Sequence, residues 1–191
     1  MTQKLIDIFE LKPGFEILDE TFSNEIISEC YLQEPYFENV TFINIKLNDP
    51  EIYYGKFVQC KFINFNFHEG MWSKCEFKTC SFQNTSFSNA RLNRIFFFEG
   101  TSFECCKFIN LELISTDFLE CKFLQTNWNN ISFQNSAFSS IELIDTVFEH
   151  LSFDQNPSLA LALTKESPKI RKGVSNFQDF LKEIKMFEKN G

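Results

Sequence analysis

The sequence predicts an all-β solenoid, in which short units of five residues stack on one another. Phe occurs 26 times among 191 residues, and most of these side chains fall into one series with a spacing of five. A strand would repeat its buried residues every two positions and a helix every 3.6, so neither element alone explains this spacing. Five residues cannot form a core by themselves. Each unit must therefore bury its large side chain against copies of itself.

Large apolar residues occupy the centre of each unit from Phe22 to Phe153. The series is Phe22, Ile27, Leu32, Phe37, Phe42, Leu47, Ile52, Phe57, Phe62, Phe67, Trp72, Phe77, Phe82, Phe87, Leu92, Phe97 and, after one step of six, Phe103, Phe108, Leu113, Phe118, Phe123, Trp128, Phe133, Phe138, Leu143, Phe148, Phe153. All 27 are apolar, which indicates a continuous core. Its expected central members are Phe62, Trp72, Phe77, Phe82, Phe87, Phe108, Phe123, Trp128 and Phe133.

A second inward position lies two residues before each centre and is mostly small. It holds Cys60, Cys75, Cys80, Thr85, Ala90, Thr101, Cys106, Thr116, Cys121, Thr126, Ser136 and Thr146. One large and one small inward side chain per unit suit a narrow, densely packed core. Pro35, Pro50, Gly55 and Gly70 depart from the pattern at this position. Because proline lacks an N–H donor, we expect weaker hydrogen bonding between the early coils.

These units resemble those of the pentapeptide-repeat proteins over about residues 20 to 154. In that family four units form the four sides of one coil, which implies a right-handed quadrilateral parallel β-helix. The 27 units then make about seven coils, with a length of roughly 32 Å at the usual strand spacing. We expect an N-terminal cap at 1–19, the β-helix at 20–155, and a C-terminal cap with an amphipathic helix at 156–191.

The two ends of the chain supply covers for the open ends of the solenoid. Residues 2–12 are typical of a short helix, capped by Thr2 and stopped at Pro13-Gly14. The C-terminal helix carries its apolar residues at helical spacing. They are Phe177, Phe180, Leu181, Ile184 and Phe187. Two interpretations stay open: this helix packs on its own solenoid, or it forms a homodimer as in many members of the family.

The sequence contains no group of residues that indicates a catalytic site, a cofactor site or a metal site. His68 and His150 fall about four coils apart, and no glycine-rich phosphate loop follows a strand. Six of the seven cysteines occupy the small inward position, where free Cys packs as a small hydrophobe, and Cys105 points outward. A disulfide between the stacked Cys60 and Cys80 is disfavoured by the geometry of parallel side chains. We therefore expect a protein that is not an enzyme and has no cofactor.

The step of six introduces Gly100 and is flanked by outward-pointing aromatic residues. One interpretation is a one-residue bulge at a corner, and the other is a contact site. Phe96, Phe98 and Leu119, with Asp117 and Glu120, form the candidate partner surface, because exposed apolar clusters often mark interfaces.

Charge and composition limit the classes of partner. The net charge is −8, and residues 20–155 contain 18 acidic and 9 basic side chains, so direct binding of nucleic acid or of an anionic membrane is not expected. No apolar run of 18 residues and no export signal is found, which favours a cytoplasmic protein with reduced thiols. The family resemblance implies a mimic of DNA that binds DNA gyrase or topoisomerase IV and protects it from quinolones or toxins. The alternative is a scaffold or regulator with another protein partner.

Overall fold

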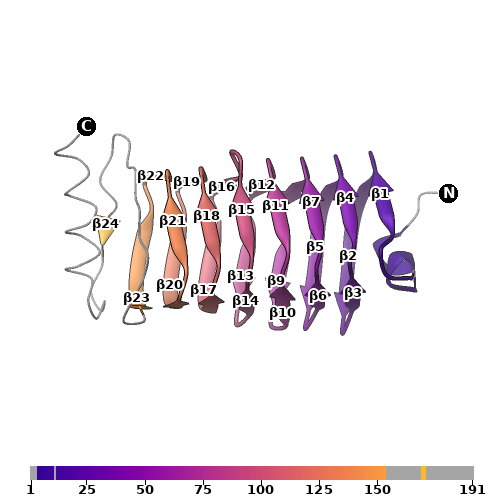
Figure 1. Ribbon diagram of the computed structural model, residues 1–191, viewed down its shortest axis with the longest axis horizontal. Helices are drawn as coiled ribbons and strands as arrows, with labels where there is room; N and C mark the ends of the chain where they lie inside the picture. The colour runs from indigo at the N-terminus through magenta and orange to yellow at the C-terminus, as the bar shows by residue number, and fades with distance from the viewer. Residues whose placement is uncertain (1–3, 11, 154–168, 171–191) are drawn as a thin grey trace.

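The computed structural model describes residues 4–10, 12–153 and 169–170. Within these residues the chain forms a parallel β-solenoid, whose coils lie side by side along one axis (Figure 1). One side of the solenoid is a sheet of seven strands, which gives about seven coils. The remaining strands form a continuous second sheet over the other three sides, because several of them run around a corner.

The first side is formed by one short strand from each coil. Its strands are β1 (Glu16–Leu18), β4 (Tyr36–Glu38), β7 (Lys56–Val58), β11 (Glu76–Lys78), β15 (Phe96–Phe98), β18 (Asp117–Leu119) and β21 (Ala137–Ser139). The corner-crossing strands are β2 (Thr21–Ser28), β5 (Thr41–Asn48), β17 (Lys107–Ile114), β20 (Asn127–Gln134) and β23 (Val147–Phe153).

Short strands complete the other three sides. The second side holds β8 (Lys61–Ile63), β12 (Ser81–Gln83), β16 (Ser102–Glu104), β19 (Lys122–Leu124) and β22 (Glu142–Ile144). The third side holds β9 (Asn66–His68) and β13 (Ser86–Ser88), and the fourth holds β3 (Tyr31–Gln33), β6 (Glu51–Tyr53), β10 (Met71–Ser73) and β14 (Arg91–Asn93). A final strand, β24 (Lys169–Ile170), pairs with β23.

The register between coils shows that four units make one coil. Ile17 pairs with Phe37 and Phe37 with Phe57, so each residue lies beside the residue twenty positions further on. After Gly100 the offset becomes 21 for one coil, with Phe97 beside Phe118, and the offset of twenty then returns. The inserted residue therefore leaves the stacked columns intact.

Rings of consecutive coils stack in the core. Phe57 and Phe77 have centroids 4.6 Å apart at an angle of 5°, and Phe103 and Phe123 are 4.8 Å apart at 4°. All nine central aromatic residues named from the sequence are buried. A period of five thus places one large side chain on each side of every coil. A period of twenty places it on the large side chain of the next coil, which is another ring on most of the first and second sides.

The small inward residues do more than fill space. Thr116 Oγ1 donates to the carbonyl oxygen of Leu92 in the preceding coil at 3.0 Å, and Ser136 Oγ accepts from the amide of Thr116 at 3.1 Å. Cysteine fills the same role, since Cys75 Sγ accepts from the amide of Gly55. These side chains satisfy buried backbone groups at the corners, which explains why Thr, Ser and Cys recur there.

Prolines and glycines are stacked in pairs along the early coils. Gly55 follows Pro35, and Gly70 follows Pro50, twenty residues later. At these positions the proline has no N–H to donate to the next coil, and the glycine twenty residues later has no side chain that could accept such a bond. Neighbouring ladder bonds have ordinary lengths, with the carbonyl of Pro50 accepting at 2.8 Å from Met71. The prolines thus keep the bonds that their carbonyls accept, and only the bond that an N–H would donate at Pro35 and Pro50 is missing, so the expected local weakening stays a prediction.

Every corner places its residue in the left-handed region, with φ near +50° to +60° from Asp19 to His150. Asn is favoured there because its short side chain tolerates this conformation and bonds locally. The amides also bond to one another along the axis. Asn64 Nδ2 donates to Asn44 Oδ1 at 2.9 Å, and Asn44 Nδ2 donates to Asn24 Oδ1 at 2.9 Å.

The N-terminal end differs in detail from the sequence-based expectation. Leu5–Glu10 (η1) is a 3₁₀-helix rather than a longer helix over residues 2–12. The amides of Leu5 and Ile6 donate to the carboxylate of Glu25, at 2.8 and 3.2 Å, so the solenoid itself caps this helix. Strand β1, inside the expected cap at 1–19, already pairs with β4. The expected cap Thr2 and the C-terminal helix lie outside the described residues.

Candidate interaction surface

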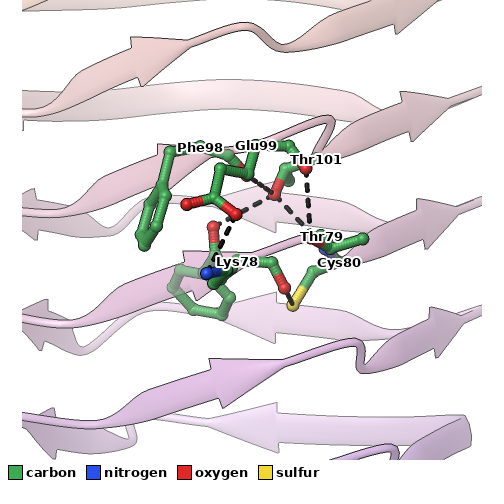
Figure 2. Close-up of polar contacts among 7 residues, drawn as sticks. Lys78, Thr79, Cys80, Phe98, Glu99 and Thr101 are labelled. Atoms are coloured by element: carbon green, nitrogen blue, oxygen red, sulfur yellow. Dashed lines mark hydrogen bonds and ion pairs between the residues drawn. The ribbon is translucent and has the colours of Figure 1, made fainter.

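The inserted residue forms a turn at the corner after β15 (Figure 2). Gly100 has φ +80°, and the amide of Thr101 donates to the carbonyl oxygen of Phe98 at 3.3 Å. Thr101 Oγ1 donates to the same oxygen at 2.9 Å. Lys78 Nζ lies 2.9 Å from the carboxylate of Glu99, across to the preceding coil. The turn's own Thr101 and a lysine of the preceding coil thus hold the turn, which fits the bulge interpretation.

Apolar side chains are exposed on the first side, next to this turn. Phe96 is 44% exposed, Leu119 is 38% exposed, and Phe98 is half-buried. Phe96 and Phe98 contact each other edge to face, with centroids 6.4 Å apart. Leu119 lies on β18, the strand paired with β15. The three residues form one cluster over two coils, the Phe96 cluster.

The two acidic residues of the candidate partner surface lie beside the Phe96 cluster but differ in environment. Asp117 is the strand partner of Phe96, and its Oδ1 accepts from the amide of Ala137 at 3.1 Å. Partial burial raises the pKa of the Asp117 carboxyl above its ordinary value, although this hydrogen bond lowers it. Glu120 is exposed at the corner. Of the two carboxylates, that of Glu120 is therefore the more accessible to a partner.

The structure gives His68 a partner that the sequence did not suggest. Its Nδ1 lies 2.9 Å from Ser88 Oγ in the next coil, and its Nε2 lies 3.6 Å from Glu69 Oε1. A nucleophilic serine also needs free donors for an oxyanion. Here the amides of Glu69 and Asn89 donate to carbonyls of the following coils at 2.8 and 2.9 Å. The contact is a link between coils rather than a catalytic dyad.

The cysteines have the environments that their positions predict. All seven have free thiols, six are buried, and Cys105 is exposed. Burial raises the pKa of Cys75 to about 12, although its hydrogen bond from the Gly55 amide lowers it. In the part of the chain that the structure describes, no three His, Cys, Asp or Glu side chains are placed to hold a metal ion. No helix among those residues is long and apolar enough for a membrane span.

The structure does not describe the predicted C-terminal interface residues, and it shows tyrosines that the sequence-based predictions did not include. Phe177, Phe180, Leu181, Ile184 and Phe187 lie outside the described residues. The tyrosines are not among the residues predicted from the sequence, although all four fall within residues 31–54. That clustering is the signal that could have found them.

Comparison with known proteins identifies the architecture. No family model and no curated protein sequence matches the chain. The solved structure of QnrB1, a plasmid-mediated fluoroquinolone resistance protein, is similar with a TM-score of 0.50 over 92% of this chain and 91% of that one. This chain has the pentapeptide-repeat fold. Sequence identity to QnrB1 is 15%, so the likeness concerns the fold alone.

Two cyanobacterial pentapeptide repeat proteins are more distant. HetL from Nostoc, which is involved in the regulation of heterocyst differentiation, has a TM-score of 0.41 and 9% identity, over 78% of this chain and 60% of its own. Rfr23 from Cyanothece has a TM-score of 0.27 and 9% identity, over 75% of this chain and 90% of its own. The pentapeptide-repeat fold of this chain therefore rests on its own coils and on the QnrB1 comparison.

Proposed function

We propose that this protein is a non-enzymatic interaction module, which presents a rigid acidic solenoid to a protein partner. The continuous core carries this proposal. Inward positions are filled by stacked rings and by hydrogen-bonded Thr, Ser and Cys. Outward positions are free to vary, and the backbone beneath them is held from coil to coil. Such a scaffold fixes the spacing of outward side chains, which suits recognition of a surface.

The Phe96 cluster is the proposed contact surface. It combines exposed aromatic and aliphatic side chains with the acidic Glu120 at its edge. Aromatic residues contribute strongly at interfaces because they bury a large area at low cost in side-chain entropy. The turn at Gly100 holds Phe98 in place through its carbonyl oxygen.

The partner proposed for the first test is a type II topoisomerase, with the solenoid as a mimic of duplex DNA. The shared fold with QnrB1 and the excess of nine acidic over basic residues in the coils support this choice. Duplex DNA of about 32 Å carries roughly 19 phosphate charges, so the coils reach about half of that density. The second candidate is a scaffold for another protein, which this lower charge density favours.

The experiment is a gyrase supercoiling assay with purified protein, with and without a fluoroquinolone. We expect inhibition, or protection from the drug, at micromolar protein. The variant Phe96→Ser/Leu119→Ser should lose the effect, whereas Ile63→Ser/Ile109→Ser, which alters half-buried aliphatic side chains on two other sides, should keep it.

One outcome would contradict the topoisomerase partner, and another would contradict the Phe96 cluster as the contact surface. If neither assay responds with the source organism's own gyrase, the topoisomerase proposal is abandoned. If both variants act like the wild-type protein, the effect persists but the Phe96 cluster is not the contact surface.

A further inference from the structure

All four tyrosines of the sequence lie on the early coils, around the corner between the fourth and first sides. Tyr31 is 53% exposed, Tyr54 is 46% exposed, and Tyr36 and Tyr53 are half-buried. Tyr31 on β3 and Tyr53 on β6 contact each other with ring centroids 5.6 Å apart. These strands lie in the indigo-to-violet part of the solenoid, at the opposite end from β22 and β23 (Figure 1).

The tyrosine rings are held beside carboxylates. Tyr53 donates its hydroxyl hydrogen bond to Glu51 Oε2 at 3.2 Å, and Glu51 is also the strand partner of Tyr31. Tyr36 donates to Glu38 Oε2 at 2.8 Å. The hydrogen bond to Glu38 is the largest cause that raises the pKa of Tyr36 above its ordinary value. Each carboxylate therefore lies next to an aromatic ring whose orientation is already fixed.

The ammonium group of Lys74 already lies over the face of one of these rings, that of Tyr54. Lys74 Nζ lies 4.5 Å from the centroid of the Tyr54 ring and donates to its hydroxyl at 2.5 Å. Ammonium and guanidinium groups are attracted to the face of an aromatic ring at this separation. The intramolecular contact shows which chemistry these rings accept. The Tyr31–Tyr53 pair presents the same kind of ring beside a carboxylate.

The charges nearby favour a positive ligand. Residues 30–39 and 50–58, which form this part of the two sides, contain Glu34, Glu38 and Glu51 and one basic residue, Lys56. With Lys74, which reaches Tyr54 from the next coil, the excess of negative charge is one. A guanidinium group can stack on an aromatic face while its N–H groups bond to a carboxylate. Nucleic acid and anionic lipid lack that positive charge and would be repelled by these glutamates.

We propose that the tyrosine edge, consisting of Tyr31, Tyr36, Tyr53, Glu38 and Glu51, binds an arginine- or lysine-bearing segment of a partner protein, while Tyr54 keeps its contact with Lys74. The inference rests on the proposed function as an interaction module. Its Tyr36 and Glu38 share the first side with the Phe96 cluster but lie three coils away from it, and Tyr31, Tyr53 and Glu51 lie on the fourth side. The fixed rings and carboxylates lower the entropic cost of binding a flexible basic segment.

The test titrates an acetylated hexapeptide of alternating glycine and arginine into the full-length protein by calorimetry. A peptide with glutamine in place of arginine serves as the control ligand. We expect binding of the arginine peptide alone, weakened by added salt. In Tyr31→Ser/Tyr53→Ser and in Glu38→Gln/Glu51→Gln the affinity should fall about fivefold or more. Circular dichroism checks that each variant is folded.

A matched variant separates local recognition from general charge attraction. Glu104→Gln/Asp145→Asn removes the same charge from the second side and should change the affinity less than twofold. Equal losses in both acidic variants, or no binding to the wild-type protein, would overturn the proposal. Sedimentation of each variant tests a second copy as the occupant, and self-association lost only with the tyrosines would also overturn it. The gyrase assay can fail while this titration succeeds, so the two proposals are tested separately.

Discussion

Phe62 and Phe82, twenty residues apart in the chain, stack face to face with centroids 4.5 Å apart and an angle of 7° between their rings. Phe82 has a second parallel neighbour on its other side, Phe103, at 4.8 Å. On this side the core is thus a column of aromatic rings, and each ring supports the coil before it and the coil after it. Loss of one ring should affect both neighbours.

Phe82→Ala is therefore expected to lower the free energy of unfolding by about 3 to 5 kcal/mol. The matched control is Phe98→Ala, which removes a half-buried ring from the outside of the same solenoid and should cost about 1 kcal/mol. Urea denaturation followed by circular dichroism measures both. Similar costs for the two variants would contradict the columnar core.

Gly70 and Gly100 both have φ near +75°, but their surroundings differ. A Cβ atom at Gly70 would lie 2.2 Å from the carbonyl oxygen of Pro50, whereas nothing lies within 4 Å of one at Gly100. Gly100→Ala should cost about 1 to 2 kcal/mol through backbone strain alone. Gly70→Ala should cost about 1 to 3 kcal/mol more, because the backbone of the neighbouring coil must shift. The difference between their denaturation midpoints checks this prediction, and a Gly70 variant as stable as the Gly100 variant would refute it.

The two tryptophans offer a further paired test. Trp128 Nε1 donates to Thr126 Oγ1 at 3.1 Å, whereas Trp72 Nε1 is buried with no hydrogen-bond partner among the described residues. Trp72→Phe removes an unpaired donor, so it should cost about 1 to 3 kcal/mol less than Trp128→Phe. Unfolding free energies of the two variants provide the measurement. A larger cost at position 72 would mean that the indole group there is satisfied in solution.

Stability should fall at alkaline pH because of the buried thiols. Burial raises the pKa of Cys75 and of Cys106 to about 12, while a thiol in the unfolded chain ionises near pH 8.5. Below about pH 8.5 these thiols are protonated in both the folded and the unfolded chain, so the folded state keeps its full stability there. Above that pH the unfolded chain loses protons that the folded chain retains, so each such thiol lowers the unfolding free energy by up to about 1.4 kcal/mol per pH unit, until pH passes the folded value.

Denaturation midpoints between pH 8 and pH 10 test this dependence. Cys75→Ala should reduce the slope of stability against pH, whatever its effect on absolute stability. The exposed Cys105 provides the control, since Cys105→Ala should leave the slope unchanged. An unchanged slope in the Cys75 variant would exclude this thiol as a cause.

Much of the fold could be predicted from the sequence because a single period controls it. The spacing of five gives the inward centres, the small position and the corners, and the family resemblance gives four sides to a coil. The cap was harder to predict, since Glu25 binds the start of η1 across a separation of nineteen and twenty residues. The first unit at Phe15–Asp19 was missed, although Ile17 lies five residues before Phe22 and continues the series.

The surface was less predictable than the core. Phe96 and Leu119 could be placed outward from the period alone, and their exposure in the structure agrees. The role of the tyrosines depends on the orientation of their rings, which is set by hydrogen bonds to Glu38 and Glu51. A repeat determines where a side chain starts but not where its far end lies.

The direction of the interstrand hydrogen bonds has a mechanical consequence. They run from coil to coil along the axis, as in the bonds from Lys61 to Val40 and from Ser81 to Cys60. A tensile force applied to the two ends of the solenoid would pull along these bonds and concentrate on the outermost coil. The coils would then detach one after another, each at low force, whereas a force applied across the axis would meet covalent backbone. We therefore expect the solenoid to resist deformation across its axis and to yield more easily when it is stretched along its axis.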